Sequence, residues 1–206
     1  MIDATLLPLQ RRALSPVASV AAERGIHADQ ITLAGFGIGL LGCLSLCFGQ
    51  FALGLVLILL NRLLDGLDGA VARQTKPTER GAFLDIALDF VFYAMVPLGF
   101  AMHDPAQNAL PAAVLIAAFV GTGSSFLAFS VIAEKRGLSS YDYPSKGIYY
   151  LGGLTEGFET IVLFVLMCLF ADYFPVFAYV FAAACAVTTL TRWHQGWTAF
   201  APQSDS

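Results

Sequence analysis

Four aspartates within one short stretch of an otherwise apolar chain constrain the fold most strongly. They are Asp65, Asp68, Asp85 and Asp89. The first two are spaced i, i+3 and the last two i, i+4, so each pair falls on one face of a helix. Between the pairs, Pro77 disfavours helix at the residue before it, which predicts a turn over residues 76–78. The stretch therefore predicts two antiparallel helices, joined by a short loop, that point four carboxylates at one another.

The composition indicates that these carboxylates lie in a membrane. Hydrophobic residues make up 57% of the 206 residues, and the mean hydropathy is +0.71, whereas soluble domains are about 45–50% apolar. One charge at the centre of a bilayer costs at least ~2.5–3.5 kcal/mol, and Arg62 and Arg73 balance only part of the negative charge. Protons or divalent cations must supply the rest, and carboxylate clusters suit Mg²⁺, Mn²⁺ or Ca²⁺. The alternative, a structural cluster of protonated acids and ion pairs, does not explain the small residues on the same helix faces.

Apolar segments of roughly membrane-spanning length follow one another from residue 31 onward. We predict six spans: 31–50, 51–74, 80–102, 109–133, 147–171 and 173–198. The preceding residues 1–30 mix leucines and valines with arginines, which predicts an amphipathic juxtamembrane helix on the cytoplasmic surface rather than a secretory signal. We therefore expect an all-α membrane protein whose six-helix transmembrane domain occupies residues 31–200.

The positive charges orient these spans. With both termini in the cytoplasm, all 11 Lys and Arg residues fall on the cytoplasmic side. A rise of ~1.5 Å per residue then places both aspartate pairs at a similar depth, in the cytoplasmic half of the membrane. A site there is open to a soluble substrate from the cytosol and to a lipid from the inner leaflet.

The aspartate stretch resembles the signature of the CDP-alcohol phosphotransferases, D-x2-D-G-x2-A-R followed after a spacer by G-x3-D-x3-D. Every fixed position is matched, by Asp65, Asp68, Gly69, Ala72, Arg73, Gly81, Asp85 and Asp89. The spacer, residues 74–80, is one residue shorter than usual, which changes the loop and not the direction of the aspartates. The segments GTGSSFLAF and KGIYYLGGLTEGFET are similar to a bacterial inner-membrane subgroup, so we expect that location.

The resemblance implies an enzyme that transfers a phosphatidyl group from CDP-diacylglycerol to a small alcohol and releases CMP. It also implies a homodimer in the bilayer and no nucleic-acid partner. All four aspartates are candidate ligands of one or two Mg²⁺ or Mn²⁺ ions that bridge the donor's diphosphate, Asp65, Asp68 and Asp85 foremost. Asp89, one turn beyond Asp85, is expected to act as the general base toward the acceptor hydroxyl. Residues expected at the nucleotide and diphosphate are Asp65, Gly69, Ala72, Arg73 and Thr32.

Polar residues in the later part of the chain are candidates for the acceptor site. They are Lys135, Lys146, Glu156, Glu159 and Arg192. The basic residues favour a phosphorylated acceptor, because a charge-assisted hydrogen bond is worth ~1.5–3 kcal/mol, and glycerol 3-phosphate is the acceptor we expect first. The two glutamates, in the predicted fifth span, suit a hydroxyl or an ammonium group instead. Anchoring of the topology is the alternative role for the basic residues.

Three other functions stay open at this point. A phosphotransferase with a CDP-choline or CDP-ethanolamine donor and a diacylglycerol acceptor would use the same chemistry. A cation transporter also explains acids within the membrane, but the sequence shows no interrupted helices in two related halves. A structural subunit without activity would not need every position of the motif.

Overall fold

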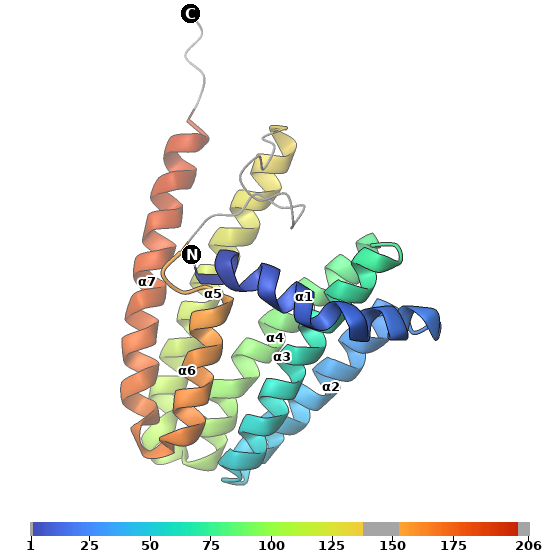
Figure 1. Ribbon diagram of the computed structural model, residues 1–206. Coiled ribbons are helices and arrows are strands. Elements are labelled where there is room, and N and C mark those ends of the chain that lie inside the picture. The colour runs from blue at the N-terminus through green and yellow to red at the C-terminus, as the bar shows by residue number, and fades with distance from the viewer. Residues whose placement is uncertain (1, 138–152, 202–206) are drawn as a thin grey trace, which may run out of the picture.

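The computed structural model describes residues 2–137 and 153–201, which form helices and no strand (Figure 1). The elements in chain order are α1 (Ile2–Glu23), α2 (Ala28–Cys47), α3 (Phe51–Gln74), α4 (Glu79–His103), α5 (Pro105–Lys135), α6 (Gly157–Leu169), the 3-10 helix η1 (Ala171–Tyr173) and α7 (Phe174–Ala199). The predicted all-α architecture is confirmed for this part of the chain.

Four of the described helices are long and apolar enough to cross a membrane, namely α2, α4, α5 and α7. Helix α3 has 24 residues and lies in the same bundle (Figure 1), but it carries the first aspartate pair between Arg62 and Arg73. Helix α6 is apolar and shorter, with 13 residues. A count of six spans therefore remains a prediction.

The expected fifth span, residues 147–171, is not a continuous helix in its described part. Residues 153–156 are not helical, and α6 begins at Gly157. The cause is a capping box, in which the Glu156 carboxylate accepts from the backbone of the first turn and the Glu159 carboxylate accepts from the Glu156 N–H at 3.2 Å. Both glutamates thus lie at the start of α6 rather than in the interior of a longer helix. Residues 138–152 lie outside the described residues.

Helix α1 crosses the bundle and packs on α3 (Figure 1). The buried residues of this contact are Leu14, Ala18 and Ala21 of α1 and Ala70 and Val71 of α3, and Ile31 of α2 belongs to the same cluster. Val17 and Val20 of the same helix are exposed. A helix with apolar residues both inside and outside the contact agrees with the expected N-terminal helix, and its position on the membrane surface stays a prediction.

Glycines allow α2, α3 and α4 to approach closely. A Cβ on Gly99 of α4 would lie 2.9 Å from the carbonyl oxygen of Cys43 in α2, and a Cβ on Gly42 of α2 would lie 3.1 Å from Leu57 Cβ of α3. A side chain at either glycine would push the helices apart. These contacts hold both aspartate-bearing helices against α2.

The turn between the aspartate-bearing helices lies where the sequence predicts it. Residues 76–78 are not helical, and the Thr78 hydroxyl oxygen accepts a hydrogen bond from the Gly81 N–H at 3.0 Å, which caps α4. Helix α3 runs toward this turn and α4 runs back from it (Figure 1). The two aspartate pairs are therefore on adjacent antiparallel helices.

We expect Gly99→Ala to lower the free energy of unfolding by about 1–3 kcal/mol, because the new methyl group meets a backbone carbonyl that cannot rotate away. Gly37→Ala in α2 is the matched control, since nothing lies within 4 Å of its Cβ position. Thermal unfolding of the two purified variants in detergent measures the difference. Equal midpoints for both variants and the parent would contradict the close α2–α4 contact.

Candidate active site

Three of the four aspartates converge. Asp65 and Asp68 lie one turn apart on α3 and face Asp85 on α4, and one carboxylate oxygen from each lies within 4.8 Å of the others. Asp68 is buried, whereas Asp85 is exposed. The spacing of the aspartates and the turn between the helices thus produce the convergence that the sequence predicts, for three carboxylates.

This donor set suits a hard divalent ion. Mg²⁺ and Mn²⁺ prefer carboxylate oxygens, and three such oxygens lie close enough to share one ion. The Thr32 hydroxyl of α2 donates a hydrogen bond to Asp68 Oδ2 at 2.5 Å, which fixes the orientation of that carboxylate. Thr32, expected near the nucleotide, therefore also supports a candidate metal ligand, a contact that depends on how α2 packs on α3.

The fourth aspartate has a different partner. Asp89 Oδ1 accepts a hydrogen bond from Arg62 Nη2 at 2.8 Å. The Nη1 atom of the same arginine lies 3.7 Å from Asp65 Oδ2. Asp89 therefore forms an ion pair across α3 and α4 rather than joining the cluster of three carboxylates, a distinction that the spacing of the motif does not reveal.

A cavity of about 310 Å³ lies beside the three carboxylates, between α2, α3 and α4. It brings together most residues expected at the nucleotide, and its lining includes Thr32, Asp68, Gly69, Ala72, Arg73 and Asp85. A Cβ on Gly69 would lie 3.2 Å from Arg73 Nη1, so this glycine leaves room for the guanidinium. Asp65 lies instead in a narrower space, which all four aspartates line together with Arg62.

An ion pair at the rim of this cavity was not predicted. Arg80 of α4 donates from Nε to Asp29 Oδ2 at 2.8 Å, joining the start of α4 to the start of α2. A Cβ on Gly81 would lie 3.0 Å from Asp29 Oδ1, so the motif glycine makes room for this pair. The sequence contained the two charges, but only the helix packing makes them partners.

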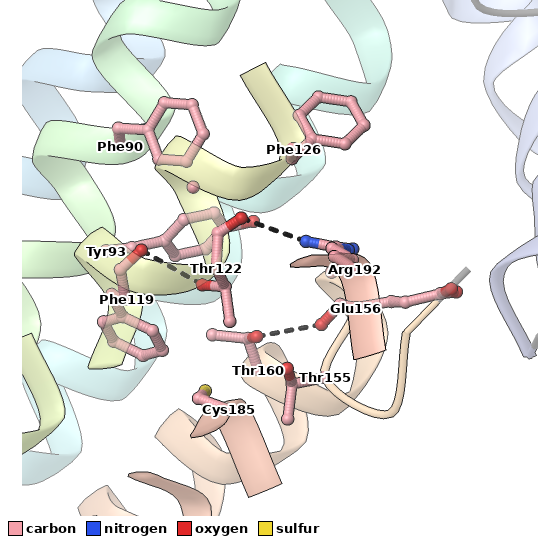
Figure 2. A pocket seen from close by; sticks show the side chains of 12 residues that line it. Phe90, Tyr93, Phe119, Thr122, Phe126, Thr155, Glu156, Thr160, Cys185 and Arg192 are labelled. Carbon is pink, nitrogen blue, oxygen red and sulfur yellow. Dashed lines mark hydrogen bonds between the residues drawn. The ribbon is translucent and has the colours of Figure 1, made fainter. Parts of the chain in front are cut away.

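A second cavity, of about 230 Å³, lies between α4, α5, α7 and the start of α6 (Figure 2). Its lining includes Phe90, Tyr93, Phe119, Phe126, Glu156 and Arg192. Arg192 is buried, donates from Nη1 to the Thr122 carbonyl oxygen at 3.0 Å, and lies over the Phe126 ring at 5.7 Å. Figure 2 shows the Glu156 carboxylate directed away from the aromatic rings, and it accepts from the Gly153 N–H at 2.9 Å.

The structure unites only some of the residues expected at the acceptor. Glu156 and Arg192 line the second cavity. Lys135 is exposed at the end of α5 and is not among the described residues that line it. Glu159 caps α6, and Lys146 lies outside the described residues. The aromatic walls were missed, because phenylalanines spread over several apolar helices carry no local signal of a cavity.

Tyr93 connects the two parts of the site. Its ring lines the second cavity, and its hydroxyl oxygen accepts a hydrogen bond from Arg62 Nη1 at 3.3 Å. Arg62 in turn holds Asp89. Tyr93 and Arg62 therefore link the aromatic cavity to Asp89 through two hydrogen bonds.

Comparison with known proteins agrees with this arrangement. The family model for CDP-alcohol phosphatidyltransferase matches residues 26–191, which include every position of the aspartate motif. Inner membrane protein YnjF of Escherichia coli (strain K12) is 52% identical over 197 residues, covering 96% of each chain. Phosphatidylinositol phosphate synthase of Mycolicibacterium smegmatis is 32% identical over 195 residues, covering 87% of this chain and 81% of the relative.

Solved structures share the fold. Phosphatidylinositol phosphate synthase of Mycobacterium tuberculosis with CDP-DAG bound has a TM-score of 0.73 and 23% identity, covering 94% of this chain and 99% of that one. The same enzyme in complex with manganese and citrate has a TM-score of 0.73 and 22% identity, with 93% of each chain covered. The helix arrangement described above is thus similar to that of this phosphatidylinositol phosphate synthase.

We expect Asp85→Asn to weaken Mn²⁺ binding by at least about tenfold, because it removes one of the three converging ligands. Glu79→Gln is the matched control, since it removes the same charge from the exposed first turn of the same helix. Equilibrium dialysis of the purified protein against Mn²⁺ measures both affinities. An Asp85→Asn variant that binds as tightly as the control would exclude Asp85 as a ligand.

Proposed function

The chain belongs to the CDP-alcohol phosphatidyltransferase family, and we propose that it transfers a phosphatidyl group from CDP-diacylglycerol to a small alcohol, releasing CMP. The observation that carries this proposal is the convergence of Asp65, Asp68 and Asp85 beside a cavity lined by four further motif residues, Gly69, Ala72, Arg73 and Gly81. The relatives named as phosphatidylinositol phosphate synthases support the same reaction class.

The donor side of the reaction follows from the first cavity. Asp65, Asp68 and Asp85 would hold Mg²⁺ or Mn²⁺, which when bound neutralises charge on the diphosphate. Thr32 keeps Asp68 oriented for this role. Gly69 and Ala72 present little bulk to the nucleotide, and Arg73, which lines the same cavity, is placed to pair with a phosphate.

The acceptor side follows from Asp89 and the second cavity. The acceptor hydroxyl oxygen attacks the phosphorus of the phosphatidyl group, and the bond from that phosphorus to the CMP oxygen breaks. Asp89 accepts the hydroxyl proton. Arg62 holds its carboxylate in place for this step. Tyr93, which lines the second cavity and accepts a hydrogen bond from Arg62, connects this cavity to the carboxylates.

Two phosphorylated alcohols are our candidate acceptors. Glycerol 3-phosphate is the one expected from the basic residues of the sequence, with Arg192 as its phosphate partner. An inositol phosphate is the second, because several relatives are named as synthases of phosphatidylinositol phosphate or archaetidylinositol phosphate. Arg192 is the basic residue in the described lining of the second cavity, so in this proposal the phosphate lies at its guanidinium.

The remaining parts of the proposal concern the membrane. We place the protein in the bacterial inner membrane, where the relative YnjF is named as residing, with six spans, both termini in the cytoplasm, and a homodimeric assembly. The aspartates then lie near the cytoplasmic surface, where CMP can leave. The transporter alternative would need ion movement without CMP release.

The reaction itself is tested with purified protein, CDP-diacylglycerol, Mg²⁺ or Mn²⁺, and a panel of glycerol 3-phosphate, inositol phosphate, serine, glycerol and choline. We expect CMP release and a new phospholipid with a phosphorylated acceptor, and no turnover after exhaustive EDTA treatment, because the diphosphate charge is then not neutralised. Chromatography and mass spectrometry identify both products. Full turnover in EDTA, or a preference for choline, would contradict the proposal.

We expect Asp89→Asn to lower kcat by about 10²–10⁴-fold, because the amide cannot accept the hydroxyl proton, while the donor KM changes little. Asp172→Asn is the matched control, since its side chain is exposed in η1, away from the carboxylates. Steady-state CMP release measures both. Near-normal turnover by Asp89→Asn would remove the base assignment.

We expect Arg192→Ala to raise the acceptor KM by about tenfold or more, since 1.4 kcal/mol of lost binding corresponds to a factor of ten, and to leave the donor KM unchanged. Lys135→Ala is the control, because Lys135 is exposed outside the described lining of the second cavity. The KM values come from titrations of each substrate. An unchanged acceptor KM in Arg192→Ala would remove the phosphate assignment.

A further inference from the structure

Arg62 is a buried cation placed between two of the four aspartates. Its side chain is 11% exposed, with Nη2 2.8 Å from Asp89 Oδ1 and Nη1 3.7 Å from Asp65 Oδ2. A guanidinium remains charged at any pH a protein tolerates. The space between these two carboxylates is therefore permanently occupied by positive charge.

The surroundings fix Arg62 in this position. Its Nε donates to Asn61 Oδ1 at 2.7 Å, and Asn61 Nδ2 donates to the Gly35 carbonyl oxygen of α2 at 2.8 Å. The guanidinium carbon lies 4.5 Å from the centre of the Phe92 ring, a favourable cation–π distance. Every nitrogen of the guanidinium thus has a partner, and its plane rests on an aromatic ring, so the arginine cannot leave the carboxylates without breaking several contacts.

The helix packing supports the same position. A Cβ on Gly39 of α2 would lie 2.9 Å from Phe92 Cδ2 and 3.0 Å from Asn61 Nδ2. The glycine therefore makes room for both side chains that support Arg62. Three helices contribute to the placement of this one charge, which is more support than an incidental surface ion pair receives.

We propose that Arg62 takes the place of a second divalent ion, so that this enzyme works with one ion on Asp65, Asp68 and Asp85 while Asp89 stays off the metal. An ion shared by Asp65 and Asp89 would lie against the guanidinium, and like charges repel more strongly in a partly buried site than in water. The carboxylate oxygens that converge come from the other three aspartates. This inference rests on the proposed function, because it assumes that the carboxylates bind metal.

The arrangement gives Asp89 a separate task. Held by Arg62 through Oδ1 rather than by metal, its carboxylate can serve as the base toward the acceptor hydroxyl. Arg62 also donates to the Tyr93 hydroxyl. One side chain therefore fixes the position of the Asp89 carboxylate relative to the wall of the acceptor cavity. Arg62 is in this sense a positioning residue.

Electron paramagnetic resonance of Mn²⁺ tests the proposal on the full-length protein in detergent or nanodiscs, without turnover. Chelator-treated protein is titrated with Mn²⁺, alone and with CDP, and bound ions are counted from the loss of the free-ion signal. We expect one ion per chain, with the hyperfine spectrum of an isolated Mn²⁺. Two ions per chain with a spin-coupled spectrum, in either condition, would overturn the inference while leaving the proposed function intact, whereas no bound ion would overturn both.

Variants separate the roles of the charges. Arg62→Met, which removes the charge and keeps the length, should admit a second ion and give a coupled spectrum, whereas Arg62→Lys should remain at one ion. Arg136→Met is the charge-matched control, because the Arg136 guanidinium donates to the carbonyl oxygens of Ala199 and Phe200 at the C-terminal end of α7. If Arg62→Met folds and still binds one isolated ion, the inference is wrong.

Asp89→Asn keeps the inference testable even if Arg62→Met does not fold. We expect its Mn²⁺ affinity to stay within about threefold of the parent, because Asp89 is not a ligand. The loss of a true ligand or its direct support weakens metal binding by about 10–100-fold. An Asp89→Asn variant that loses more than threefold would place Asp89 on the metal and overturn the inference.

Discussion

The need to neutralise carboxylates in a low-dielectric setting governs this structure. Four aspartates on two apolar helices repel one another, and each unpaired charge away from water is costly. The protein supplies a permanent cation, Arg62, close to Asp65 and Asp89. The other carboxylate oxygens converge on a space that suits a divalent ion. In the proposed function, the ion that relieves this repulsion would also bind the donor's diphosphate.

This electrostatic arrangement depends on close helix packing. Gly39, Gly42 and Gly99 allow α3 and α4 to lie against α2, and α2 contributes Thr32 to the orientation of Asp68. Helices held further apart would separate the carboxylates from their partners. The small residues and the acidic residues therefore serve one purpose, which is to keep several charges within bonding distance inside a membrane protein.

The sequence predicted the parts of the site that depend on local geometry. Spacing within each aspartate pair and the Pro77 turn were enough to predict two antiparallel helices with converging carboxylates. The pairing of Asp89 with Arg62 could not be predicted from the sequence. Whether residues on two helices become partners depends on how each helix is rotated about its axis. The start of α6 was missed because Glu156 and Glu159 resemble acids within a span, whereas their spacing also fits a capping box. The aromatic cavity required knowledge of which faces of α4, α5 and α7 meet.

The position of the metal tests this account most directly. A structure of the protein with Mn²⁺, with the ion located by its anomalous X-ray scattering, shows which carboxylates bind it. The account predicts one anomalous peak, among Asp65, Asp68 and Asp85, with the guanidinium of Arg62 still between Asp65 and Asp89. A peak bonded to Asp89, with Arg62 displaced, would contradict it.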